Sequence, residues 1–127
     1  MTPVHLLLVA AGGAAGSVCR HLVGLAALRL LGAGFPWGTL AVNVAGSFAM
    51  GVFIGLLALR FQGSPELRLL VATGFLGGFT TLSAFSLDTL VLYERGQPGL
   101  AAAYVGATLV LSLAGIVAGL FVVRTLS

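Results

Sequence analysis

Four long apolar segments alternate with short polar connections along the chain. The segments cover about residues 4–31, 37–59, 67–93 and 100–123, and the connections between them contain glycine, proline and charged residues. About 20 predominantly apolar residues in a helix cross a bilayer, so each segment is long enough for one crossing. The pattern predicts an all-α integral membrane protein, in which residues 1–127 form one transmembrane domain of four helices.

Composition supports this fold class and excludes a soluble one. The chain is 59% hydrophobic and 7% charged, whereas a soluble domain carries roughly a quarter charged residues. The net charge of +3 comes from six arginines against three acids. Because the arginines are scattered one or two at a time, they do not form the basic patch of a nucleic-acid-binding protein. We therefore expect a multi-pass protein in contact with membrane lipid, without a nucleic-acid partner.

The third segment contains an unusual stretch at residues 73–86. This stretch holds three glycines and five hydroxyl residues. Gly77 and Gly78, followed by Thr80 and Thr81, favour a departure from helical geometry near residues 77–81, since glycine gains little from remaining helical. Freed carbonyl groups inside a membrane need partners, and broken transmembrane helices often carry ion sites. We therefore take this stretch as the functional centre.

The distribution of arginines does not indicate one orientation in the membrane. Three arginines are expected on the side of the termini and three on the other side. The first set is Arg60, Arg68 and Arg124, and the second is Arg20, Arg29 and Arg95. Positive loops normally stay in the cytoplasm, so this balance has two explanations. Copies insert both ways and pair as antiparallel dimers, or a short chain has a weak bias by chance.

Polar residues follow one face of the second segment and one face of the fourth. Both lines have spacings of i, i+4 and i+8, which place their members on one side of a helix. The lines are Thr39, Asn43 and Ser47, and Tyr104, Thr108 and Ser112. Neutral donors of this kind could bind a small anion without trapping it. The alternative is hydrogen bonding between helices, which is least satisfactory for Asn43.

Charged and aromatic residues within the segments reduce the number of candidate functions. Arg20 either attracts anions at a pore mouth, or reaches the interface or a carbonyl group at a helix end. Phe85 either presents its positive ring edge to an anion or packs, which is the commoner role. The first, second and fourth segments contain no acid. A proton-coupled exporter usually needs a buried carboxylate, so this composition argues against one.

Together these motifs resemble the Fluc/CrcB family of fluoride channels over nearly the whole chain. The matching stretches are residues 12–16 with Arg20, residues 36–40 with Asn43 and Gly46, and residues 74–81 with Ser83 and Phe85. The family usually carries a pair of pore phenylalanines three residues apart, and Leu82 stands in place of the first. Leucine has similar bulk but no ring quadrupole. We expect fluoride conduction to persist with an altered rate or selectivity.

The resemblance implies an antiparallel, dual-topology homodimer with two fluoride pores, each lined by both subunits. It also implies a structural Na⁺ at the dimer centre, held by the main-chain carbonyl groups of Gly77 and Thr80. Oxygen ligands suit such a hard cation. Arg20 is expected in a vestibule. The expected fluoride pathway comprises Thr39, Asn43, Leu82, Ser83, Phe85, Tyr104, Thr108 and Ser112.

The leading hypothesis is therefore a passive, fluoride-selective channel, not an enzyme. It would export cytoplasmic fluoride and relieve fluoride toxicity, in the inner or plasma membrane of a bacterium. One alternative is a small multidrug-type secondary transporter, which would need a membrane glutamate in the first helix. Another is a non-transporting assembly subunit, which would need neither Asn43 nor a broken helix.

Overall fold

The computed structural model describes residues 2–60 and 63–126, and within this part of the chain the regular structure is entirely helical. Four helical segments are long and apolar enough to cross a membrane. They are α1 (Pro3–Leu31), α2 (Trp37–Arg60), the third segment (Pro65–Glu94) and α6 (Pro98–Leu126). This confirms the all-α fold with four membrane helices.

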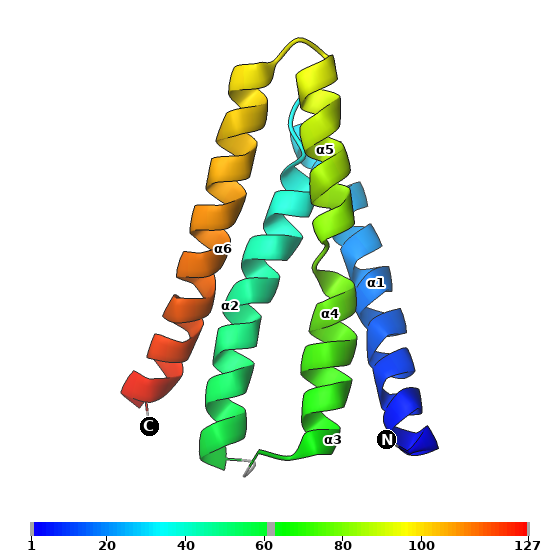
Figure 1. Ribbon diagram of the computed structural model, residues 1–127, viewed down its shortest axis with the longest axis vertical. Helices are drawn as coiled ribbons and strands as arrows, with labels where there is room; N and C mark the ends of the chain where they lie inside the picture. The colour runs from blue at the N-terminus through cyan, green and yellow to red at the C-terminus, as the bar shows by residue number, and fades with distance from the viewer. Residues whose placement is uncertain (1, 61–62, 127) are drawn as a thin grey trace.

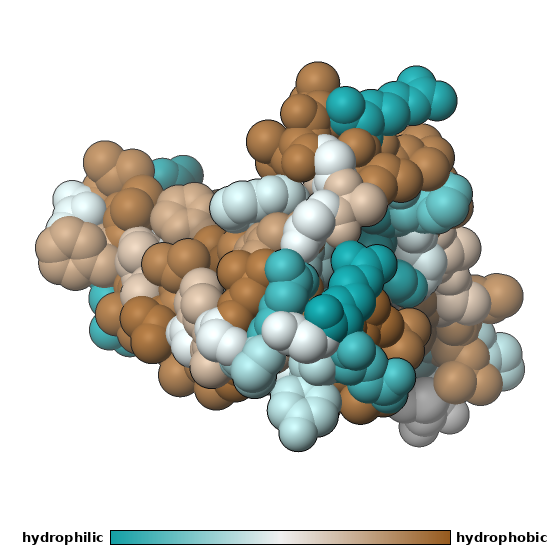
Figure 2. Space-filling model, turned by 90° about the horizontal axis from the view of Figure 1, so that it is seen from above, coloured by the Kyte–Doolittle hydropathy of each residue, from teal (hydrophilic) through white to brown (hydrophobic). Residues whose placement is uncertain are grey.

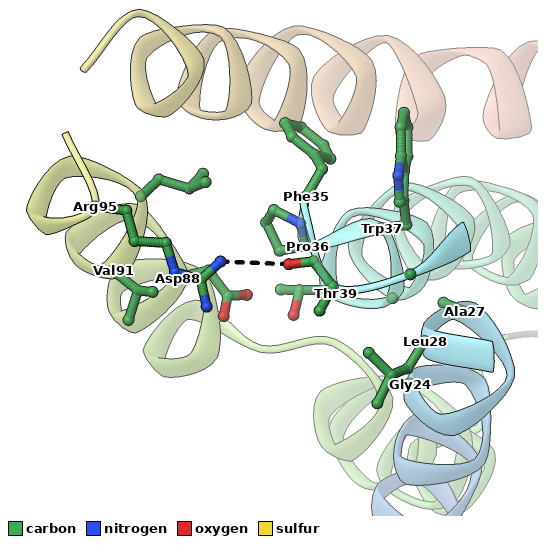
Figure 3. A pocket seen from close by; sticks show the side chains of 14 residues that line it. Gly24, Ala27, Leu28, Phe35, Pro36, Trp37, Thr39, Asp88, Val91 and Arg95 are labelled. Carbon is green, nitrogen blue, oxygen red and sulfur yellow. Dashed lines mark hydrogen bonds between the residues drawn. The ribbon is translucent and has the colours of Figure 1, made fainter. Parts of the chain in front are cut away.

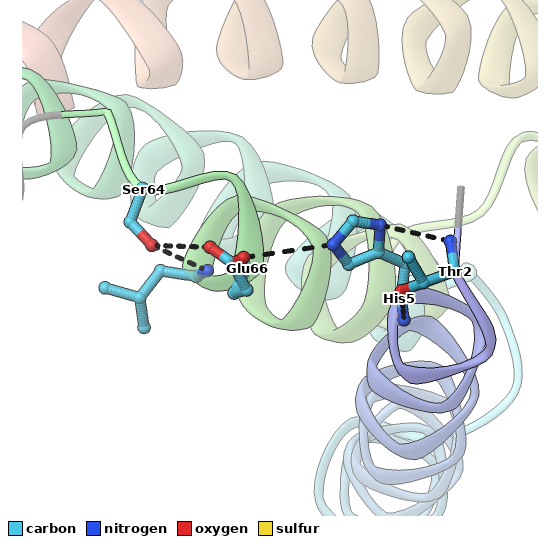
Figure 4. Close-up of polar contacts among 5 residues, drawn as sticks. Thr2, His5, Ser64 and Glu66 are labelled. Atoms are coloured by element: carbon cyan, nitrogen blue, oxygen red, sulfur yellow. Dashed lines mark hydrogen bonds and ion pairs between the residues drawn. The ribbon is translucent and has the colours of Figure 1, made fainter.

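Local sequence signals fix the ends of the helices at the side of the termini. Thr2 caps α1, since its Oγ1 accepts the His5 N–H at 3.2 Å while the Thr2 N–H faces His5 Nδ1 at 3.5 Å. Ser64 caps the third segment by accepting the Leu67 N–H at 3.3 Å. His5 Nε2 also lies 3.9 Å from Glu66 Oε1 (Figure 4), which joins these two helix ends.

The third segment is divided into several pieces. It comprises α3 (Pro65–Leu67), the π-helix η1 (Arg68–Leu76), α4 (Gly77–Phe79) and α5 (Leu82–Glu94). Thr80 and Thr81, between α4 and α5, are extended, with φ/ψ of −89°/159° and −154°/124°. The predicted interruption is therefore present. That η1 would be a π-helix was not predicted from the sequence.

The predicted cause of the break was wrong. Gly77 has helical φ and ψ of −62° and −38°, and both it and Gly78 belong to α4. The extended backbone falls on the two threonines, whose β-branched side chains suit that conformation. Gly78 instead serves close packing, because a Cβ at this position would lie 2.6 Å from the Gly13 carbonyl oxygen.

The break redirects the third segment from one neighbouring helix to another. Before the break, η1 and α4 pack against α1, and after it α5 packs against α6. Helix α2 lies between these pairs and packs along α6 (Figure 1). Both described ends of the chain, the end of α2 and the start of α3 lie at one end of the molecule. The break therefore sits where α1, α2 and the third segment meet.

The flanks of the molecule are apolar, and its polar residues gather in limited areas. The view along the molecule from the α5–α6 connection shows hydrophobic residues around a more hydrophilic middle (Figure 2). Glu94, Arg95 and Gln97 are exposed at this connection. The well-buried cluster at this end consists of Leu92, Ala101 and Tyr104. Such a surface suits a protein surrounded by hydrocarbon rather than water.

Candidate functional site

A pocket of about 410 Å³ lies between α2, α6 and the break. It brings together residues from three segments that are distant in sequence. The polar members of its lining are Asn43 and Ser47 from α2, Thr80 and Thr81 from the break, and Thr108 and Ser112 from α6. Leu82 and Phe85 supply part of its apolar wall. Five of the eight residues expected along the fluoride pathway therefore share one pocket.

Two hydroxyl groups on α6 are buried without a partner. Among the described residues, neither Thr108 Oγ1 nor Ser112 Oγ makes a hydrogen bond. A buried polar group without a partner is costly, and most such groups in proteins are paired. Both hydroxyl groups belong to residues lining the pocket. They are therefore suited to donate hydrogen bonds to a small anion that enters it.

Asn43 holds the break by pairing with both backbone groups of Thr81. Its Oδ1 accepts the Thr81 N–H at 2.7 Å, and its Nδ2 donates to the Thr81 carbonyl oxygen at 2.9 Å. An amide nitrogen carries two N–H donors, so one donor is used here and a second is left for another acceptor. Asn43 thus has a structural contact that its position in the polar line did not reveal.

The carbonyl groups at the break fit a hard cation, although their role as Na⁺ ligands stays a prediction. In a continuous helix the Thr81 N–H would bond to the Gly77 carbonyl oxygen, but here it bonds to Asn43. The Thr80 side chain donates to the Leu76 carbonyl oxygen at 3.0 Å, so its hydroxyl proton is occupied. The oxygens offered by Gly77 and Thr80 are of the kind that hard cations prefer.

Arg20 reaches the break from α1. Its Nε donates to the Gly78 carbonyl oxygen at 3.1 Å, which is the carbonyl pairing that the sequence left open. Arg20 also lines a separate pocket of about 480 Å³, in company with Thr39, Val42 and Thr81. The arginine is therefore both a hydrogen-bonding partner of the break and part of the wall of this second pocket.

Tyr104 lies apart from the Asn43 pocket. Its side chain is fully buried, and its hydroxyl donates to Asp88 Oδ2 at 3.2 Å. Its ring packs against Phe85, with ring centroids 5.2 Å apart, and edge-on against Phe35 at 5.4 Å. Tyr104 therefore supports Phe85 from behind. Sequence reasoning missed Asp88, for which the signal was an acid well inside the apolar third segment.

Asp88 and Thr39 line a third pocket, of about 270 Å³, near the α1–α2 connection. Figure 3 shows their side chains together at this pocket. Arg95 also lines this pocket, and its Nη1 donates a hydrogen bond to the Ala33 carbonyl oxygen at 3.3 Å (Figure 3). Thr39 is thus placed between two pockets and outside the Asn43 pocket.

Of the two residues at the start of α5 that were expected along the fluoride pathway, Leu82 lines the pocket and Ser83 does not. Leu82 is 75% exposed on this chain and lines the Asn43 pocket. Ser83 is also exposed, but its hydroxyl lies 3.3 Å from Thr81 Oγ1 and it is absent from the pocket lining. Leu82 and Phe85, one helical turn apart, therefore form the apolar side of the pocket, while Ser83 accompanies the helix cap made by Thr81.

The family model and the similar proteins all point to the same family. Residues 7–120 match the family described as CrcB-like protein, Camphor Resistance (CrcB). A protein of Rhizobium johnstonii named fluoride-specific ion channel FluC is 57% identical over 98% of this chain and 99% of its own length. Proteins of the same name from Agrobacterium fabrum and Mesorhizobium japonicum are 54% and 52% identical, over 97% and 96% of this chain and 98% of their own lengths.

Proposed function

This chain belongs to the CrcB-like family, and we propose that it is a fluoride-selective channel through which cytoplasmic fluoride leaves a bacterial cell down its gradient. It is a multi-pass membrane protein, and its relatives are channels rather than enzymes. The observation that carries the proposal is the pair of buried, unpartnered hydroxyl groups of Thr108 and Ser112. Both residues line a pocket that Asn43 also lines.

The residues in and around this pocket have different roles in anion passage. The hydroxyl groups of Thr108 and Ser112 and the free N–H of Asn43 replace water around the ion. Phe85 supplies a ring whose edge is positive, and Tyr104 holds that ring in place. Arg20 raises the local potential for anions near the entrance that it lines. Neutral donors bind weakly enough to let the ion leave.

A second copy of the chain would complete the pore. The pocket borders on Leu82, Leu109 and Leu113, which are 75%, 52% and 66% exposed. These side chains form an apolar surface beside a polar pocket, and a second copy that covers it would separate the ion path from lipid. The balanced arginines favour an antiparallel pair, since neither orientation satisfies the positive-inside rule better.

A sodium ion at the centre of this pair would stabilise the assembly. The main-chain carbonyl groups of Gly77 and Thr80 would hold it, and the ion would supply positive charge between two backbone breaks. The diversion of the Thr81 N–H to Asn43 supports this assignment, because it deprives the Gly77 carbonyl of its usual helical donor.

Fluoride release from liposomes tests the channel function. Purified protein is reconstituted into vesicles loaded with potassium fluoride, and valinomycin sets a potassium-driven potential while an electrode records external fluoride. We expect rapid release that protein-free vesicles lack, and much slower release of chloride from matched vesicles. Fluoride release no faster than in protein-free vesicles would contradict the proposal.

A further inference from the structure

The backbone break is held from two sides by side chains that replace its missing helical hydrogen bonds. Asn43 pairs with Thr81 from α2, and Arg20 pairs with the Gly78 carbonyl from α1. We propose that Asn43 is a positioning residue, which keeps the break open and so leaves the Gly77 carbonyl oxygen free for a cation. This inference rests on the proposed Na⁺ site and assigns the side chain that creates it.

An amide suits the Asn43–Thr81 contact because it supplies both an acceptor and a donor, and the acceptor is the part that draws the Thr81 N–H away from the Gly77 carbonyl. Thr81 is extended, so its N–H and carbonyl group point to the same side and require one acceptor and one donor. Asn43 supplies both, at 2.7 Å and 2.9 Å. A carboxylate offers acceptors alone, and leucine offers neither. Within a membrane, where water cannot take their place, these two bonds stabilise the extended conformation.

The consequence appears in three consecutive carbonyl groups. The Leu76 carbonyl accepts from the Thr80 N–H and the Thr80 hydroxyl, each at 3.0 Å. The Gly78 carbonyl accepts from Arg20 Nε at 3.1 Å. The Gly77 carbonyl between them would accept from Thr81 in a continuous helix, and Asn43 takes that donor. Gly77 is also exposed on this chain, as a residue that shares a ligand with a second copy must be.

Asn43 therefore connects two sites that are otherwise separate. Asn43 lines the pocket that contains Thr108 and Ser112, while its oxygen holds the Thr81 N–H away from the Gly77 carbonyl. Without the Asn43 oxygen, the Thr81 N–H would return to Gly77 and extend α4 by a residue. The cation would then lose a ligand, whether or not fluoride passed.

The test compares sodium-dependent stability of the full chain in detergent for four proteins. They are the wild type, Asn43→Leu, Asn43→Asp and the control Ser47→Ala, which alters a residue one turn further along α2 in the same pocket. Thermal midpoints are measured while NaCl replaces N-methylglucamine chloride at constant ionic strength. A ligand that binds only the folded state raises the midpoint by an amount that grows with the logarithm of its concentration divided by its dissociation constant.

We expect the wild type and Ser47→Ala to share one sodium dependence. Asn43→Leu should weaken apparent sodium affinity by about tenfold or more, because Thr81 reclaims the Gly77 carbonyl. Asn43→Asp keeps the acceptor for the Thr81 N–H and should remain within about threefold of the wild type. If Asn43→Leu does not fold, Asn43→Ser replaces it with the same expectation, since its short hydroxyl does not span both groups of Thr81.

Two results for the variants would overturn the inference. One is a wild-type sodium dependence in Asn43→Leu, or in Asn43→Ser where that variant is used. The other is an Asn43→Asp protein that loses sodium dependence as fully as Asn43→Leu. A wild type that sodium does not stabilise also overturns it, together with the cation site. Fluoride release measured on the same preparations judges the channel function separately, because sodium-dependent stability does not require conduction.

Discussion

The Tyr104 hydroxyl donates a hydrogen bond to Asp88 Oδ2 at 3.2 Å, from a side chain that is fully buried. This bond joins α6 to α5 at the level where the Tyr104 ring packs against Phe85. It fixes the ring from its polar end while Phe35 meets it edge-on. The position of Phe85 in the pocket wall therefore depends on a contact outside the pocket.

Removing the Tyr104 hydroxyl should destabilise the protein. Tyr104→Phe leaves Asp88 without this donor, and we expect a loss of about 1–3 kcal/mol in unfolding free energy. Asp88→Asn keeps an acceptor for the hydroxyl and should cost less. Thermal midpoints in detergent, followed by fluorescence of the single tryptophan, Trp37, give the comparison. Equal midpoints for Tyr104→Phe and the wild type would show that the bond contributes nothing to stability.

Restoring an aromatic ring at position 82 should change conduction without changing the fold. Leu82 is 75% exposed on this chain and lines the pocket, so no contact within the chain excludes a larger side chain. Leu82→Phe adds a positive ring edge beside Phe85, and we expect fluoride release from liposomes to change in rate or in selectivity over chloride. Identical rates and selectivity for the two proteins would remove any special role for a ring at this position.

The unpartnered hydroxyl groups on α6 should matter for conduction and not for stability. Thr108→Val with Ser112→Ala removes two buried groups that bond to no other described residue, so the thermal midpoint should stay level or rise. Fluoride release should slow by about tenfold, because the ion loses two donors. Thr89→Val serves as the control, since that hydroxyl bonds to the Phe85 carbonyl at 2.8 Å. Unchanged release from the double variant would exclude these hydroxyls from the pathway.

A methyl group at Gly16 should prevent close packing of α1. A Cβ there would lie 2.0 Å from the Phe75 carbonyl oxygen, and neither the α1 backbone that carries the Cβ nor the η1 backbone that carries the oxygen can yield easily. Gly16→Ala should therefore cost about 1–3 kcal/mol or more and reduce the yield of folded protein in size-exclusion chromatography. Gly24→Ala, on the same helix, meets nothing within 4 Å and should behave as the wild type. Equal yields for the two variants would contradict the packing assignment.

Much of the candidate site followed from periodicity, and its internal contacts did not. The i, i+4, i+8 spacing correctly placed Thr108 and Ser112 on one face of α6, because a helix repeats every 3.6 residues. The same spacing grouped Tyr104 with them, and on the second segment it grouped Thr39 with Asn43, but Tyr104 and Thr39 lie outside the pocket. Tyr104 turns to Asp88 on α5, a partner that no spacing within α6 reveals.

The position of the break was also predictable from nearby residues, whereas its conformation depends on a residue far away in the sequence. Its location in the third segment was predictable from glycine and threonine content, but the glycines remain helical and the threonines are extended. The extended state is stabilised by Asn43, 38 residues away in the sequence. Local propensity indicates where a helix is weak, and a distant hydrogen-bonding partner decides which residue leaves it.

The sequence by itself determined four membrane helices, an interruption in the third, and polar faces on the second and fourth. These features follow from the length of apolar runs and from helical periodicity, both of which are local. Tertiary structure alone decided that Asn43 binds Thr81, that Arg20 binds the Gly78 carbonyl, and that Tyr104 binds Asp88. Each of these bonds satisfies a polar group that is at least partly buried, and the choice of partner depends on which helices come together.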